Sequence, residues 1–106
     1  MRDNQDFEPK EIDWEASLTD AEREFIDYAI MGLPNVIARE KVEIFTGGWV
    51  SKQTLANADS KGRGPRGRLK SGKKVLYRTR DLFEWSVRRF GIREMEQLPG
   101  FGRAVA

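Results

Sequence analysis

The clearest structural signal in the chain lies in residues 64–85, GPRGRLKSGKKVLYRTRDLFEW. Two short β-prone runs, 68–70 and 74–77, stand on either side of Ser71-Gly72-Lys73. Short strands about a glycine turn are typical of a β-hairpin, so the pattern predicts one over 68–77.

An amphipathic helix is predicted directly after the hairpin, over residues 80–90 (RDLFEWSVRRF). Its apolar residues recur at helical spacing, and Gly91 should end it. We expect Trp85 to anchor the core on this helix. The partners predicted for Trp85 are Phe45, Leu76, Leu82 and Phe90, with Tyr77 closing the hairpin strand.

Two short helices are predicted before the hairpin. The first covers about 38–46 and ends at Gly47-Gly48, where a tight turn can form. The second covers about 51–58 with Ser51 as its N-cap, and its Leu55 and Ala56 should face inward. Two short helices joined by a few residues that include glycine have the spacing of a helix-turn-helix.

A further helix is predicted over 19–31. Thr19 and Glu22 match a capping box, Gly32 suits the position after the helix, and Pro34 blocks continuation. Trp49, in the turn between the two short helices, is expected to pack against this helix over 19–31, with contact to a ligand as the less favoured alternative.

The two ends of the chain are expected to carry little structure. Residues 1–16 are charged and predict a flexible acidic arm, from which Phe7 or Trp14 could dock on the domain. Residues 91–106 predict a loose tail with at most one turn near 93–98. The domain itself is predicted over 17–90.

Composition excludes several classes of function. The sequence has no cysteine and no histidine, which excludes disulfides, thiolate metal sites and the usual serine triad. The acidic residues of the arm lack a fixed geometry, so neither a metal site nor a catalytic pair is predicted there. Residues 62–67 formally match G-x-G-x-x-G, but no βαβ unit surrounds them, and their glycines are expected to let a basic loop follow a backbone closely. No apolar run is long enough to span a bilayer, no signal peptide is present, and a cytoplasmic location is expected.

Charge is divided unevenly along the chain. The total is only +2, yet residues 1–33 hold three basic and ten acidic residues, a net charge of −7. Residues 34–106 hold sixteen basic and seven acidic residues, a net charge of +9. Nine cations and no carboxylate lie between Lys61 and Arg80. Such a run favours a polyanionic partner, since the cations would repel one another without one.

Residues 37–90 resemble the small excisionase-like and AlpA-like regulators of phages and plasmids, which share a MerR-type winged helix. The resemblance rests on IAREKVEIFTG (37–47), VSKQTL (50–55) and the segment 64–85, with its glycine-centred wing tip and Arg-Asp-Leu-x-x-Trp. It implies a fold that is mainly α with a β-hairpin wing, here with an extra N-terminal helix. It also implies duplex DNA binding in transcriptional regulation or recombination directionality, associated with the nucleoid.

The predicted DNA-binding residues fall into two sets. Those of the recognition helix would reach base edges in the major groove; they are Ser51, Lys52, Gln53, Thr54 and Asn57. Those of the loop and wing would contact phosphates or a minor groove; they are Lys61, Arg63, Arg66, Arg68, Lys70, Ser71, Lys73, Lys74 and Arg78. Arg80 could serve the last helix instead of DNA, and Arg78 could pack beside Tyr77.

We therefore predict a DNA-binding protein that is not an enzyme and uses no cofactor, metal or small-molecule ligand. A second copy of the chain, adjacent copies on DNA, or an integrase or recombinase are the expected protein partners, because one small module buries little area. An interaction adaptor without a DNA role and an RNA-binding module stay open as alternatives.

Overall fold

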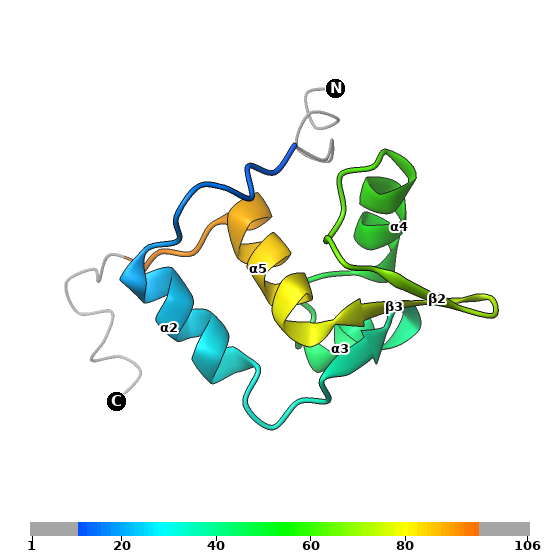
Figure 1. The fold of residues 1–106 in the computed structure, drawn as a ribbon. Helices are drawn as coiled ribbons and strands as arrows, with labels where there is room; N and C mark the ends of the chain where they lie inside the picture. The colour runs from blue at the N-terminus through cyan, green and yellow to red at the C-terminus, as the bar shows by residue number, and fades with distance from the viewer. Residues whose placement is uncertain (1–10, 96–106) are drawn as a thin grey trace.

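The computed structural model describes residues 11–95, which form a small α/β protein. Its elements, in chain order, are helix α2 (Asp20–Ala29), strand β1 (Val36–Ala38), the 3₁₀ turn η1 (Arg39–Lys41), helices α3 (Val42–Phe45) and α4 (Lys52–Ser60), strands β2 (Leu69–Ser71) and β3 (Lys74–Arg78), and helix α5 (Thr79–Phe90). Figure 1 shows α5 in the middle, with α2 on one side and α4 and the hairpin on the other. The predicted docking of Phe7 and most of the predicted tail lie outside the described residues.

The predicted hairpin is confirmed. β2 and β3 pair antiparallel, with Ser71 opposite Lys74, so the turn between them has two residues. Gly72 has a φ of +62°, and no residue other than glycine has a positive φ among those described. A single positive φ at the first turn position is the requirement of a type II′ turn, which explains the glycine.

The sheet has a third strand that the sequence did not predict. β1 pairs antiparallel with β3, with Ile37 opposite Tyr77, and the strand order is β1-β3-β2. The predicted hairpin is therefore part of a three-stranded antiparallel sheet, in a protein whose helices hold most of the residues in regular structure.

The predicted helix over 38–46 is also wrong in its extent. Residues 39–41 form a 3₁₀ turn, and only 42–45 are α-helical. Ala38, the last residue of β1, precedes this turn and makes no side-chain cap for it, because a methyl group cannot accept a hydrogen bond.

Helix α2 begins as predicted. The Glu22 amide donates to Thr19 Oγ1 at 3.0 Å, and the Thr19 amide donates to Glu22 Oε1 at 2.8 Å. This capping box satisfies two amides that a helix start otherwise leaves free. The helix ends at Ala29 instead of residue 31, and the chain turns at Gly32 with a φ of +79°.

The core centres on α5, where Trp85 and Leu82 are fully buried as predicted. Of the predicted partners of Trp85, Phe45 is 36% exposed and Leu76 is half-buried. Phe90 is 43% exposed, but its ring lies 5.9 Å from that of Trp85 in an edge-on contact, so this predicted partner is confirmed. On α4, Leu55 is buried as expected, but its inward partner is Ala58, three residues on, whereas Ala56 is half-buried.

Trp49 packs inside the protein, as its favoured interpretation predicted. Its ring lies 5.6 Å from that of Phe25 on α2 in an edge-on contact. It also lies 6.0 Å from Phe83 and 6.3 Å from Phe90 on α5. Trp49 therefore joins α2 to α5 through aromatic contacts, which favour such tilted arrangements.

Residues 11–16 do not form part of a free arm. Arg88 Nη1 on α5 donates to the carbonyls of Asp13 at 3.0 Å and Ala16 at 2.8 Å. Trp14 is half-buried against the core, which confirms its predicted docking. Arg88, on a helix distant in the chain, thus joins this segment, which the sequence predicted to be flexible, to the folded domain.

No helix in the described part of the chain is both long and apolar enough to cross a membrane.

Candidate functional site

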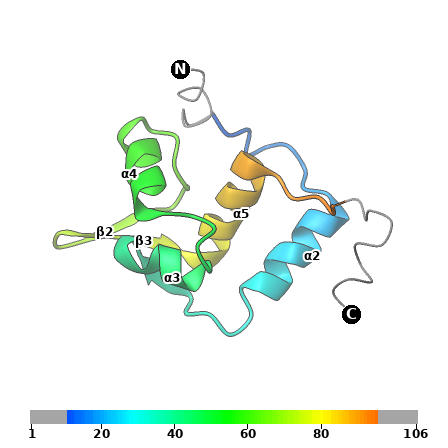
Figure 2. The same cartoon turned by 180° about the vertical axis from the view of Figure 1, so that it is seen from behind.

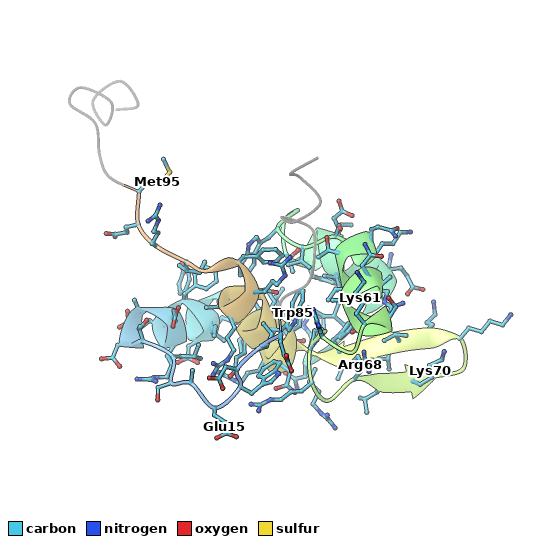
Figure 3. All side chains as sticks on the ribbon, turned by 90° about the horizontal axis from the view of Figure 1, so that it is seen from above. Glu15, Lys61, Arg68, Lys70, Trp85 and Met95 are labelled. Atoms are coloured by element: carbon cyan, nitrogen blue, oxygen red, sulfur yellow. The ribbon has the colours of Figure 1, made fainter. Side chains whose placement is uncertain are left out.

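Helix α4 and the β2–β3 hairpin lie at the same end of the molecule. Figures 1 and 2 show both on the side of α5 that faces away from α2. Figure 3 labels Arg68 beside the junction of α4 and the hairpin, and Lys70 farther out along the hairpin. The two predicted sets of binding residues are thereby brought to one region.

On α4, the predicted residues divide into a capping pair and an exposed set. The Thr54 amide donates to Ser51 Oγ at 3.1 Å, and the two hydroxyls lie 3.0 Å apart. Both side chains are half-buried, so their hydroxyls stabilise the helix start. Lys52, Gln53 and Asn57 are exposed. These three side chains can reach a ligand without breaking the cap.

The hairpin presents lysines at its outer end. Lys70, Ser71 and Lys73 are exposed, and neither lysine has an ion-pair partner among the residues that the structure describes. Lys74 is different, since its Nζ lies 2.5 Å from Glu40 Oε2 on η1. The outer end of the hairpin therefore offers two ammonium groups without a partner among the described residues, those of Lys70 and Lys73, and a paired one, that of Lys74.

Three predicted arginines make contacts within the protein. Arg66 lies within 3.8 Å of Asp81 and 3.7 Å of Glu84 on α5, with its guanidinium 4.4 Å above the Trp14 ring. Arg78 Nη1 donates to the Gly67 carbonyl at 3.0 Å. Arg68, the third, pairs with Asp59 on α4. These arginines hold the 61–68 loop against α4, α5 and β3.

Asp59, at the end of α4, is the centre of a polar cluster that we call the Asp59 cluster, made of Arg39, Asp59, Arg68 and Tyr77. Tyr77 Oη donates to Asp59 Oδ2 at 2.5 Å, and Arg39 Nη2 donates to the same oxygen at 2.6 Å. Arg68 Nη1 lies 2.8 Å from Asp59 Oδ1. Only 8% of the Asp59 side chain is exposed. The cluster joins α4, η1, β3 and the basic loop.

The contacts within the Asp59 cluster shift the pKa values of Tyr77 and Arg39. Burial, and then the hydrogen bond to Asp59, raise the pKa of Tyr77 above its usual value, because both disfavour the phenolate. Burial acts to lower the pKa of Arg39, but its hydrogen bonds to Tyr77 and Asp59 outweigh that effect and the pKa is raised. The phenol and the guanidinium are therefore held in their protonated forms.

Two glycines of the 62–67 loop, Gly64 and Gly67, serve this packing. A Cβ at Gly64 would lie 1.8 Å from Asp59 Oδ1. A Cβ at Gly67, where φ is +70°, would lie 2.8 Å from Arg78 Nη1 and 3.0 Å from Asp81 Oδ2. The expectation that these glycines let the loop follow a ligand backbone is corrected, since the close approach is to the protein's own side chains.

Lys61 and Arg63, the remaining predicted residues, are exposed on the loop, and each also has contacts within the protein. The Arg63 carbonyl accepts a hydrogen bond from Trp85 Nε1 at 2.8 Å, which fixes the loop over the core. Arg80 Nη2 lies 2.7 Å from Asp27 Oδ1 on α2, so it contacts the N-terminal helix.

Sequence reasoning missed Arg39, Glu40 and Asp59. The one available signal was that Asp59 is the last carboxylate before the run of nine cations. Within residues 11–95, no group of His, Cys, Asp or Glu side chains could hold a metal ion.

Neither a family model, nor a curated protein, nor a solved structure matches this chain.

Proposed function

We propose that this protein binds duplex DNA sequence-specifically through a winged helix-turn-helix. In this proposal α3 and α4 form the helix-turn-helix, α4 is the recognition helix, and the β2–β3 hairpin is the wing. The order of elements supports this proposal: helix α2, strand β1, the short helices α3 and α4, and then the β2–β3 hairpin. Strand β3 of the hairpin also pairs with β1.

The observation that carries the proposal is the position of the exposed polar side chains. Gln53 and Asn57 lie exposed on α4, one helical turn apart, and their amides can pair bidentately with adenine. The lysines Lys70 and Lys73 lie exposed on the adjacent hairpin, where ammonium groups suit backbone phosphates. Base-reading groups beside phosphate-binding groups are what a DNA-binding surface requires.

The RNA-binding alternative is less well supported. Single-stranded RNA is usually bound by aromatic side chains that stack bases on an exposed sheet. The aromatic residue of this sheet, Tyr77, is fully buried, and its hydroxyl is bonded to Asp59. The described strands therefore offer no stacking platform.

The biological role follows the family resemblance of residues 37–90, which suggests transcriptional regulation or control of recombination in a mobile element. Because a single module of this size buries little DNA surface, tight binding is expected to need a second copy, adjacent copies or a recombinase.

The test is selection of bound sequences from a random duplex pool at two salt concentrations, followed by two double variants. The double variant Lys70→Ala/Lys73→Ala should weaken binding to all duplexes alike. The slope of log K against log salt concentration should become shallower by about two units. The double variant Gln53→Ala/Asn57→Ala should reduce the preference for the selected sequence about 10-fold or more, because bidentate base contacts are lost.

The matched control is Arg23→Ala with Arg93→Ala, which removes two positive charges outside the proposed surface and should change binding less than the lysine pair. Circular dichroism verifies that each variant is folded. Absence of duplex binding would favour the adaptor interpretation. Duplex binding that survives the loss of Lys70 and Lys73 at full strength would instead show that the hairpin is not the phosphate-binding wing.

A further inference from the structure

Glu40 places a negative charge between the two parts of the proposed DNA surface. It lies on η1, and its carboxylate contacts Lys74, the first residue of β3, at 2.5 Å. The hydrogen bond from Lys74, with a smaller attraction from Lys52 at the start of α4, lowers the pKa of Glu40 below its usual value. Glu40 is therefore ionised at neutral pH. The turn that carries it, η1, contacts both α4 and β3.

A carboxylate and a phosphate compete for the same ammonium groups. Both are oxyanions that accept charge-assisted hydrogen bonds from lysine. A DNA phosphate that approaches Lys52 and Lys74 finds the Lys74 ammonium already bonded, and it is repelled by the Glu40 charge. The pair is exposed to solvent, with 59% of the Lys74 and 44% of the Glu40 side chain accessible. Exposed ion pairs are weak, so a phosphate can displace this one.

We propose that Lys52 and Lys74 form a phosphate subsite at the junction of α4 and the hairpin, and that Glu40 is its internal competitor. In the free protein the Glu40 carboxylate takes the place of the phosphate. Binding of DNA requires Lys74 to leave Glu40, and Glu40 thereby lowers the affinity of the protein for every duplex. This inference rests on the proposed DNA binding.

A consequence is that Glu40 limits non-specific binding of the protein to DNA. Non-specific binding is almost entirely electrostatic, so a competing carboxylate reduces it directly. The base contacts proposed for Gln53 and Asn57 are not opposed by Glu40, and they can compensate at a specific sequence.

The test is Glu40→Gln, which removes the charge and keeps the shape of the side chain. Binding to a random-sequence duplex of about 20 base pairs, measured by fluorescence anisotropy at several salt concentrations, should tighten by about two- to fivefold. The salt slope should steepen by up to about one unit, because Lys74 then contributes fully to counterion release.

Two further variants separate this mechanism from a general charge effect. Glu24→Gln on the exposed face of α2 removes the same charge at the other end of the molecule and should tighten binding less. In a Lys74→Ala background, most of the gain from Glu40→Gln should disappear, since the released ammonium is absent.

The outcomes are distinguishable. If the wild-type protein binds duplex DNA but Glu40→Gln matches Glu24→Gln, or keeps its full gain without Lys74, Glu40 is no competitor and only this inference fails. If neither the wild-type protein nor Glu40→Gln shows salt-dependent duplex binding, the proposed function fails and the subsite fails with it.

Discussion

Side chains from three other parts of the chain contact the carboxylate of Asp59. Tyr77 of β3 donates a hydrogen bond to it, and Arg39 of η1 and Arg68 of the basic loop form ion pairs with it. A buried carboxylate is costly to desolvate, and these partners offset that cost only together. In the proposed DNA complex the cluster fixes the end of the recognition helix relative to the wing, so its loss should be felt in both stability and binding.

We predict that Asp59→Ala lowers the free energy of unfolding by about 2–4 kcal/mol, because it leaves buried donors without an acceptor. Urea denaturation followed by circular dichroism measures this change. Asp27→Ala is the matched control, since Asp27 also pairs with an arginine, Arg80, but 64% of its side chain is exposed. That variant should cost less than about 1 kcal/mol, and equal losses in both variants would contradict a special role for Asp59.

At the scale of single residues, the exposure of side chains without a partner could be predicted from the sequence better than the pairing of side chains that contact one another. The exposure of Lys52, Gln53 and Asn57 followed from local helical spacing. The internal pairing of Arg66 and Arg68 did not, because their carboxylate partners are brought close only by folding. A run of like charges in a sequence thus overstates the number of cations available to a ligand.

At the scale of secondary structure, the hairpin and α5 could be predicted because their signals are local: a glycine turn between β-prone runs, and an apolar face of helical period. Strand β1 could not. Three residues are too few to show a period, and its partner β3 lies almost forty positions away in the chain. The strand exists because Ile37 packs opposite Tyr77 in the core.

The structural importance of β1 can be tested by truncating its buried side chain. Ile37 is 2% exposed, so Ile37→Ala should lower the free energy of unfolding by about 2–4 kcal/mol through the lost burial and the cavity left behind. Ile44→Ala on α3 is the matched control, because Ile44 is 71% exposed, and its cost should stay near about 0.5 kcal/mol. Chemical denaturation of both variants measures the difference; similar costs would mean that β1 does not anchor the sheet.

At the scale of the whole molecule, the uneven charge along the chain becomes an uneven charge in space. The acidic helix α2 lies at one end, and α4 and the hairpin, whose sequences carry the lysines, lie at the other (Figure 2). The net charge of +9 in residues 34–106 is nevertheless a poor count of ligand contacts, since Arg66, Arg68 and Arg78 are bonded within the protein. The exposed lysines Lys52, Lys70, Lys73 and Lys74 are the better basis for a salt slope of about 3–4.

The acidic N-terminal segment gives the last prediction, because Glu11, Asp13 and Glu15 belong to a segment held beside α5 and the basic loop. If their charge opposes DNA, replacing Glu11→Gln, Asp13→Asn and Glu15→Gln together should strengthen binding to random-sequence duplex at about 10 mM salt, where screening extends to about 30 Å. The gain should shrink near physiological salt, where the Debye length falls to about 8 Å. Amide replacements keep Trp14 and the carbonyls bound by Arg88, so stability is preserved, which deletion of residues 1–16 would not ensure.

The control is the triple variant Glu24→Gln, Asp27→Asn and Glu94→Gln, which removes the same charge elsewhere. An equal gain in the control would reduce the effect to net charge, and no gain in either would show that the segment does not compete with DNA.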